Sequence, residues 1–199
     1  VEPGDFLPSD SVLAQLQAQY VAKALHTQEV QRMNTRMNDT YEEIPQKEWQ
    51  LKGKSSEETV GEGSNGRAAF VLDGDAKTFW HTEWKSGSNN RFPHYLDFVH
   101  KGAITLNRIV LQNDANHGGN RYRAHKVVVQ VVDSNWKTKT QGTYTLGNGD
   151  QQEIVLSPAL ELSENERLRL RFTEGYDRND GMMAVSEIRF EKKNLERLR

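Results

Sequence analysis

The 199-residue chain contains no cysteine. This excludes disulfide bonds, cysteine nucleophiles and thiolate metal ligands. A domain of this length can bury a sufficient core without cross-links, so the absence is compatible with an exported protein but does not establish export.

Long apolar runs and a strong charge surplus are also missing. No stretch approaches the roughly 18 consecutive apolar residues of a membrane span, so we expect no direct membrane insertion. The net charge of -2 is too balanced for a nucleic-acid groove, which would carry a clustered basic excess. With 35% hydrophobic and 27% charged residues, the composition is typical of one packed domain with an appendage. No signal-peptide pattern opens the sequence, and we expect any such peptide to have been removed or to lie outside it.

Catalytic motifs are absent as well. There is no H-E-x-x-H pair, no clustered zinc spacing and no G-x-S-x-G elbow. The G-x-G-x-x-G match at 61–66 lacks the preceding strand and following helix of a dinucleotide site, so we interpret it as a loop. We expect a non-enzyme. A glycoside hydrolase remains an alternative, because any two strands could bring two carboxylates together.

The first segment predicts a helix. Ser9, Asp10 and Ser11 offer N-cap oxygens, and apolar residues then recur at roughly helical spacing until residue 25. We predict a helix from about residue 11 to residue 33 within a helical segment or linker, 1–46. Its apolar stripe must pack on the following domain, on a missing neighbour or on another copy.

The remainder predicts an all-β domain, 47–193, followed by a tail, 194–199. In R-L-R-L-R-F-T at 167–173, apolar and basic residues alternate, which is typical of a strand with one buried face. Short runs separated by turn residues and without intervening helices indicate an antiparallel sandwich. The expected strands are 92–99, 103–111, 126–132, 143–146, 152–156, 167–173 and 185–190.

Several motifs occur in a specific order: V-L-D-G-D-A-K-T-F-W-H-T at 71–82, P-H-Y-L-D-F at 93–98, L-N-R-I-V-L-Q-N-D at 106–114, N-R-Y-R-A-H-K-V-V-V-Q-V at 120–131 and V-S-E-I-R-F at 185–190. Together they resemble the discoidin, or coagulation-factor type C, family, and within it carbohydrate-binding module family 32. The resemblance implies a galactose-binding-like jelly-roll sandwich.

An acidic bend is a candidate calcium site. Asp73 and Asp75 flank Gly74, with Thr78 shortly after, and such oxygen ligands suit Ca²⁺. Glu187 would supply a further carboxylate. An ordinary β-turn with a solvent-facing Glu187 is the alternative. The resemblance implies a structural Ca²⁺ ion with a larger set of ligands: the Asp73 and Glu187 side chains, the Thr78 hydroxyl and carbonyl, and the Phe70, Asp75 and Ser186 carbonyls.

The resemblance also implies a sugar site in the loops. A pyranose needs an aromatic face and planar polar groups, and His81 and Trp84 are the first candidates. Galactose-binding members carry an Arg where this chain has Gln112 or Asn113, which leaves the sugar open. Asn120 and Arg121 could restore an amide and a guanidinium, and Tyr176 comes from the late loop.

The function predicted is recognition of a mono- or oligosaccharide, without catalysis, as one domain of a larger secreted or cell-surface glycan-processing protein. The expected location is extracellular, at the cell surface or periplasmic. The alternative is a discoidin-type protein-interaction or adhesion module that uses the same loops and the N-terminal helix.

Overall fold

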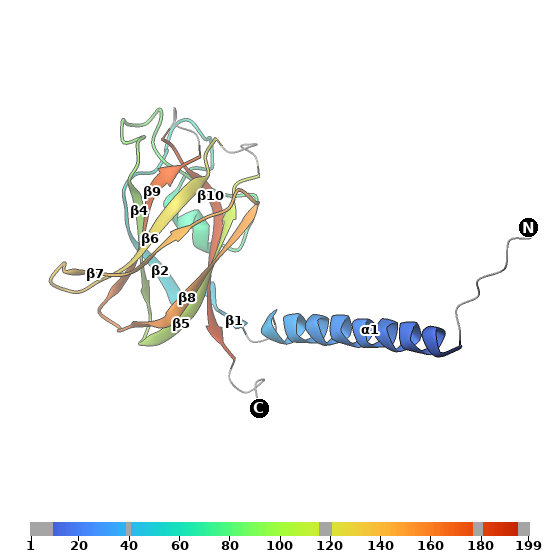
Figure 1. Cartoon of the computed structure of the whole chain (residues 1–199). Helices are drawn as coiled ribbons and strands as arrows, with labels where there is room; N and C mark the ends of the chain where they lie inside the picture. The colour runs from blue at the N-terminus through green and yellow to red at the C-terminus, as the bar shows by residue number, and fades with distance from the viewer. Residues whose placement is uncertain (1–9, 39–40, 116–120, 177–180, 195–199) are drawn as a thin grey trace, which may run out of the picture. The chain divides into compact units, whose positions relative to one another are not determined.

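The computed structural model describes residues 10–38, 41–115, 121–176 and 181–194. It divides the chain into two compact units, Val1–Thr40 together with Asn194–Arg199, and Tyr41–Lys193. The second unit is the β-sandwich of Figure 1.

The first unit contains one long helix, α1 (Asp10–Asn38). The predicted helix is confirmed and continues beyond residue 33, because residues such as Asn34 and Asn38 cost only tenths of a kcal/mol in helix propensity. No described helix is long and apolar enough to cross a membrane. Its large apolar side chains are exposed: Val12, Leu13, Leu16, Tyr20, Val21, Leu25 and Val30.

The second unit consists of two antiparallel sheets, each with five of the strands that the structure describes. One sheet has the order β1-β10-β5-β8, with β3 also paired to β10, and the other has the order β2-β4-β9-β6-β7. The strands are β1 (Tyr41–Ile44), β2 (Trp49–Lys54), β3 (Trp80–His81), β4 (His94–His100), β5 (Ile104–Asn113), β6 (Ala124–Val132), β7 (Thr138–Thr145), β8 (Gln151–Leu162), β9 (Arg167–Gly175) and β10 (Ala184–Lys193). Two short 3₁₀ helices, η1 (Gln46–Glu48) and η2 (Ala68–Leu72), lie in the connections.

The core lies between the sheets and follows the alternation of the sequence. In β9, Leu168, Leu170 and Phe172 are fully buried, whereas the arginines between them lie on the outer face. The expected core position of Trp80 is confirmed, since its ring is fully buried and its indole N–H donates to the Ser56 carbonyl at 2.9 Å. The all-β prediction is therefore confirmed by the described residues.

The sandwich begins earlier than the sequence suggests, at Tyr41 rather than at residue 47. β1 has little apolar alternation of its own. It is a strand because it pairs with the end of β10, Tyr41 opposite Lys193 and Ile44 opposite Phe190. Strands β7 and β8 also extend beyond the predicted 143–146 and 152–156, because cross-strand pairing continues through polar residues.

The loops that precede β6 and β10 meet at one end of the sandwich, at the top of Figure 1. The Ala184 N–H donates to the Tyr122 carbonyl at 3.0 Å, and the Tyr176 N–H donates to the Arg123 carbonyl at 3.3 Å. The segment after β3 joins them, because the Thr82 N–H donates to the Met183 carbonyl and the Met183 N–H donates to the Thr82 hydroxyl, both at 3.0 Å. We call this region, residues 56–66, 81–91, 121–123 and 181–183, the loop end.

Candidate functional site

The acidic bend follows directly after η2, where Gly74 adopts a left-handed φ of 76°. Asp73 organises the bend: its Oδ1 accepts the Asp75 N–H at 2.9 Å, and its Oδ2 accepts the Thr78 hydroxyl at 2.6 Å. The Thr78 hydroxyl also lies 2.9 Å from the Asp75 carbonyl oxygen. Several oxygen atoms therefore converge within one turn of chain.

Glu187 reaches this bend from β10 and is buried. The Gln46 amide donates to its Oε2 at 2.6 Å, whereas its Oε1 is buried with no hydrogen-bond partner among the described residues. Burial, and then the neighbouring Asp73 carboxylate, raise the pKa of Glu187 to about 7, against the opposing hydrogen bond from Gln46. Asp73 and Glu187 therefore lie together, as the calcium prediction requires.

The number of charged side chains around Asp73 and Glu187 limits how a metal ion could be bound there. Among the described residues, no group of three or more His, Asp or Glu side chains could hold an ion. A cation here would rely on two carboxylates, with hydroxyl and carbonyl oxygens completing its shell, which is compatible with the flexible oxygen coordination of Ca²⁺. The Asp75 carboxylate accepts the Lys77 N–H at 2.9 Å, and the Asp75 carbonyl accepts the Thr78 N–H at 3.1 Å, so an ion bound by that carbonyl would share it with this hydrogen bond.

At the loop end, Trp84 is the one predicted sugar contact with a large aromatic surface open to solvent, with 43% of the residue exposed. Its indole N–H donates to Glu62 Oε1 at 2.8 Å. The ring also lies so close to Gly61 that a Cβ there would be 2.2 Å from Trp84 Cζ2. A glycine beneath the ring and a carboxylate at its edge thus fix the orientation of Trp84.

His81 lies beneath this surface, with a relative exposure of 1%. Its Nδ1 lies 2.6 Å from the Thr82 carbonyl, which can only accept, so Nδ1 carries the proton. Its Nε2 is 3.9 Å from Glu62 Oε1, and its ring meets the Tyr122 ring edge-on at 5.0 Å between centroids. The structure thus places His81 in the layer below the exposed surface, packed against Tyr122 and next to Glu62.

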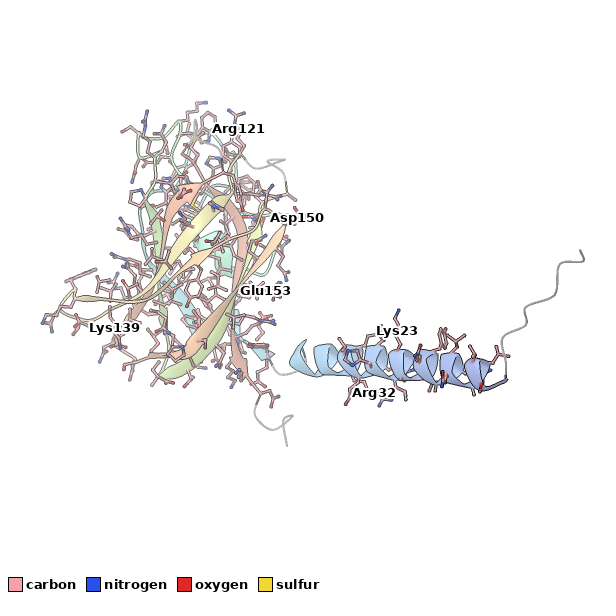
Figure 2. The ribbon with its side chains drawn as sticks, viewed as in Figure 1. Lys23, Arg32, Arg121, Lys139, Asp150 and Glu153 are labelled. Carbon is pink, nitrogen blue, oxygen red and sulfur yellow. The ribbon has the colours of Figure 1, made fainter. Side chains whose placement is uncertain are left out.

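Arg121 is exposed at the loop end (Figure 2), with its guanidinium 5.5 Å from the centre of the Tyr122 ring. Glu62 and Tyr122, neither of which the sequence analysis proposed, connect Trp84, His81 and Arg121. Glu62 lies in the G-E-G-S-N-G stretch that we interpreted only as a loop. In the sequence, only its position shortly after other acidic residues distinguishes it as a candidate.

The other predicted sugar contacts lie elsewhere or outside the description. Asn113 is buried, and its amide donates to the Gly149 carbonyl at 2.9 Å, so it anchors the turn before β8. Tyr176 is half-buried, donates its hydroxyl to the Leu146 carbonyl, and packs edge-on against His125 at 4.5 Å. Asn120 lies outside the described residues.

Glu58 is the residue that the sequence analysis missed most clearly. It is fully buried, and its carboxylate accepts the backbone N–H groups of residues 60, 61, 84, 85 and 86 at 2.7–3.1 Å. Burial alone would raise the pKa of Glu58, but these five donors outweigh it and lower the pKa well below its usual range. Glu58 therefore holds the Gly61 turn against the Trp84 segment.

Comparison with known proteins identifies the architecture. The family model described as "F5/8 type C domain" matches residues 52–188, well over half of the chain. The chain belongs to the F5/8 type C family. The recognition made from the sequence motifs is thereby confirmed, and α1 lies outside the matched F5/8 type C region.

Solved structures show the same fold. This F5/8 type C domain resembles the family 32 carbohydrate-binding module of Clostridium perfringens NanJ, solved in complex with galactose, with a TM-score of 0.60 and 19% identity over 76% of this chain and 99% of that one. It also resembles a C. perfringens family 32 module in complex with GalNAc-β-1,3-galactose, with a TM-score of 0.61 and 15% identity over 75% of this chain and 99% of that one. At these identities the likeness establishes the fold alone.

One curated relative is a sialidase of Micromonospora viridifaciens, 27% identical over 100 residues. The match covers 50% of this chain and 15% of the sialidase, so the chain spans a small part of that enzyme's length.

Proposed function

We propose that this F5/8 type C domain is a non-catalytic module that binds a glycan at its loop end. The observation that carries the proposal is the Trp84 ring, which is partly exposed and held in one orientation by Gly61 and Glu62. A fixed aromatic surface loses little entropy when it stacks on the apolar face of a pyranose. The galactose and GalNAc-galactose complexes of the structural relatives support the same class of ligand.

Polar groups around the ring would select the sugar. Arg121 carries a guanidinium beside Tyr122 at the same loop end, and Glu62 carries a carboxylate next to the indole N–H. A sugar hydroxyl placed between a donor and an acceptor of this kind discriminates against stereoisomers that leave either group unpaired. His81 would act from below, as a positioning residue for Tyr122 rather than as a direct contact.

We further propose that the acidic bend and Glu187 hold a structural Ca²⁺ ion. Such an ion would give Glu187 Oε1 a partner and would favour the ionised forms of Asp73 and Glu187. The ligands would be the Asp73 and Glu187 carboxylates, the Thr78 hydroxyl and carbonyl, and the carbonyls of Phe70, Asp75 and Ser186. The ion would fasten η2 to β10 and would take no part in any reaction.

The partial match to a sialidase supports placement of this module in a larger secreted or cell-surface protein that processes glycans. A second candidate function is protein interaction or adhesion, and the exposed apolar side chains along α1 favour it. In that case the partner would contact α1, and loss of the Trp84 ring would leave partner binding intact.

A glycan array tests the main proposal. The whole chain should retain a subset of galactose- or GalNAc-type glycans, and Trp84→Ala should reduce retention at least about tenfold, as expected for loss of a stacking ring. Val155→Ala, which removes an exposed apolar side chain from β8, is the control and should bind as the parent does. Retention that survives Trp84→Ala, or an array with no neutral glycan bound, would refute this proposal.

A further inference from the structure

A second surface lies on the outer face of the sheet β2-β4-β9-β6-β7, along its central strand β9. Arg167, Arg169 and Arg171 alternate with the buried residues of β9 and therefore share this outer face. From the first to the last of these arginines the strand spans about 13 Å.

Two aromatic rings lie along this row, one at its Arg167 end and one beside Arg169 and Arg171. The Arg167 guanidinium lies 4.6 Å from the centre of the Trp136 ring, and the Arg169 guanidinium lies 4.4 Å from the centre of the Tyr95 ring. Tyr95 is directly opposite Arg171 in the pairing of β4 with β9. The order along the face is therefore ring, cation, cation, ring, cation.

The charge on this face is not neutralised. Asp97 is the acid among these side chains, and it is buried and engaged by two of them: Arg169 donates two hydrogen bonds to it at 2.7 and 2.9 Å, and Arg167 lies 3.7 Å away. Arg171 is exposed and has no hydrogen bond or ion pair among the described residues. Three guanidinium groups against one carboxylate leave an excess of positive charge.

Trp136 is the most unusual residue of this surface. It lies in the turn between β6 and β7, 64% of it is exposed, and its φ is 62°, in the left-handed region that a bulky residue avoids. The turn imposes this conformation: Asp133 Oδ1 accepts the N–H groups of Asn135 and Lys137, both at 2.9 Å. The turn thus holds a large ring outside the core in a backbone conformation that bulky residues rarely adopt, which points to a role outside folding.

We propose that this outer face is a second binding surface, and that its ligand is a glycan chain carrying carboxylate groups. The Trp136 ring would stack on a sugar ring, and Arg171, with the free donors of Arg167, would pair with carboxylates. A nucleic acid is the less favoured ligand, since the chain has a net charge of -2 and this face presents two rings rather than a continuous stacking platform.

The Trp136 end of this surface is separate from the loop end. Tyr122 and Trp136 lie before and after β6, whose nine residues span about 30 Å. Figure 2 agrees, since Arg121, which precedes β6, and Lys139, which lies in β7 next to the turn that carries Trp136, lie toward opposite ends of the sandwich. The two sites could engage one long glycan or two different ones, and they can be tested independently.

Affinity electrophoresis of the whole chain in native gels containing polygalacturonate tests the proposal, with neutral galactan gels run in parallel. Polygalacturonate should retard the parent protein, and Trp136→Ala and Arg171→Gln should each weaken binding about fivefold or more. Arg32→Gln, which removes the same charge from α1, and Trp84→Ala, which disables the loop end, should both behave as the parent in these gels. Circular dichroism and melting curves verify that each variant is folded.

Three results would overturn the proposal: no retardation by polygalacturonate, retardation unchanged in Trp136→Ala and Arg171→Gln, or equal loss in Arg32→Gln. The proposal would also be overturned if a single-stranded oligonucleotide retarded the parent protein and the same two variants lost this retardation equally. That result would assign the surface to nucleic acid. Failure of the loop-end site gives a different result, in which Trp84→Ala has no effect on any neutral glycan.

Discussion

Replacement of Glu58 by Gln is the sharpest test of how the loop end is built, because it changes charge and hydrogen bonding with almost no change in volume. Glu58 Oε1 accepts the N–H groups of residues 60, 61 and 86, and Oε2 accepts those of residues 84, 85 and 86. A glutamine keeps one acceptor oxygen. Its NH₂ group would point at two or more backbone donors, whichever way the amide is turned.

The magnitude follows from these bonds. At least two buried N–H groups lose their acceptor at about 1–3 kcal/mol each, and the remaining bonds lose their charge-assisted strength. We expect the free energy of unfolding to fall by about 4 kcal/mol, which for a domain of this size corresponds to a melting temperature lower by about 10 °C. The assay is thermal and urea unfolding at pH 7, with Glu164→Gln, an exposed and unpaired carboxylate in the β8–β9 turn, as the control.

The pH dependence gives a second readout of the same interaction. Because the folded state lowers the pKa of Glu58, its ionisation stabilises the fold above the unfolded value near 4.5. This contribution disappears as the pH falls through the lower, folded-state pKa. The stability gap between the parent and Glu58→Gln should therefore be constant above about pH 5 and narrow in more acidic buffer. A melting temperature within about 2 °C of the parent at pH 7 would refute the reasoning.

Three further predictions concern neighbouring features. Gly61→Ala should displace the Trp84 ring, because the new Cβ would overlap that ring. Glycan binding should weaken several-fold, whereas circular dichroism should show that the sandwich stays folded. Unchanged binding would contradict the proposed role of the Trp84 ring. Chelation should lower the melting temperature and added Ca²⁺ should restore it, whereas Asp73→Ala should abolish both responses; metal analysis that finds no Ca²⁺ in the parent would argue against the ion. Burial lowers the pKa of His94, so the unfolded chain binds a proton there more readily than the folded domain does. The free energy of unfolding should therefore be constant above about pH 6.5 and decline in more acidic buffer. In urea titrations, His94→Gln should make this decline less steep. An identical decline in both proteins would assign it to other groups.

The sequence predicted those parts of the fold that repeat a local pattern. The alternation in β9 placed Leu168 and Leu170 in the core, because period-two burial is visible without knowledge of the partner strands. β1 could not be found in this way, since its pairing with the end of β10 depends on residues far away in the chain. Glu187 was proposed as a partner of Asp73 because an acid stands in an otherwise apolar strand, and the family resemblance implied the same residue.

The loop end was harder to predict for a physical reason. Trp84 and Arg121, which the sequence analysis predicted as sugar contacts, are both exposed at the loop end, but their orientation depends on Glu58, Glu62 and Tyr122. Glu58 is buried and accepts hydrogen bonds from five backbone N–H groups, but nothing in the sequence distinguishes it from the other acids of its polar segment. Asn113 illustrates the converse, since a polar loop residue that suits a ligand instead satisfies a turn of its own protein.

The position of β10 has a consequence for synthesis. It lies between β1 and β5, it carries β3, and it brings Glu187 to the bend after η2. β1 and β3 have no other strand partner among the described residues, so an emerging polypeptide would hold them unpaired until its last strand leaves the ribosome. The domain should therefore become protease-resistant in a single late step, when residue 193 is released, rather than gradually as each hairpin appears.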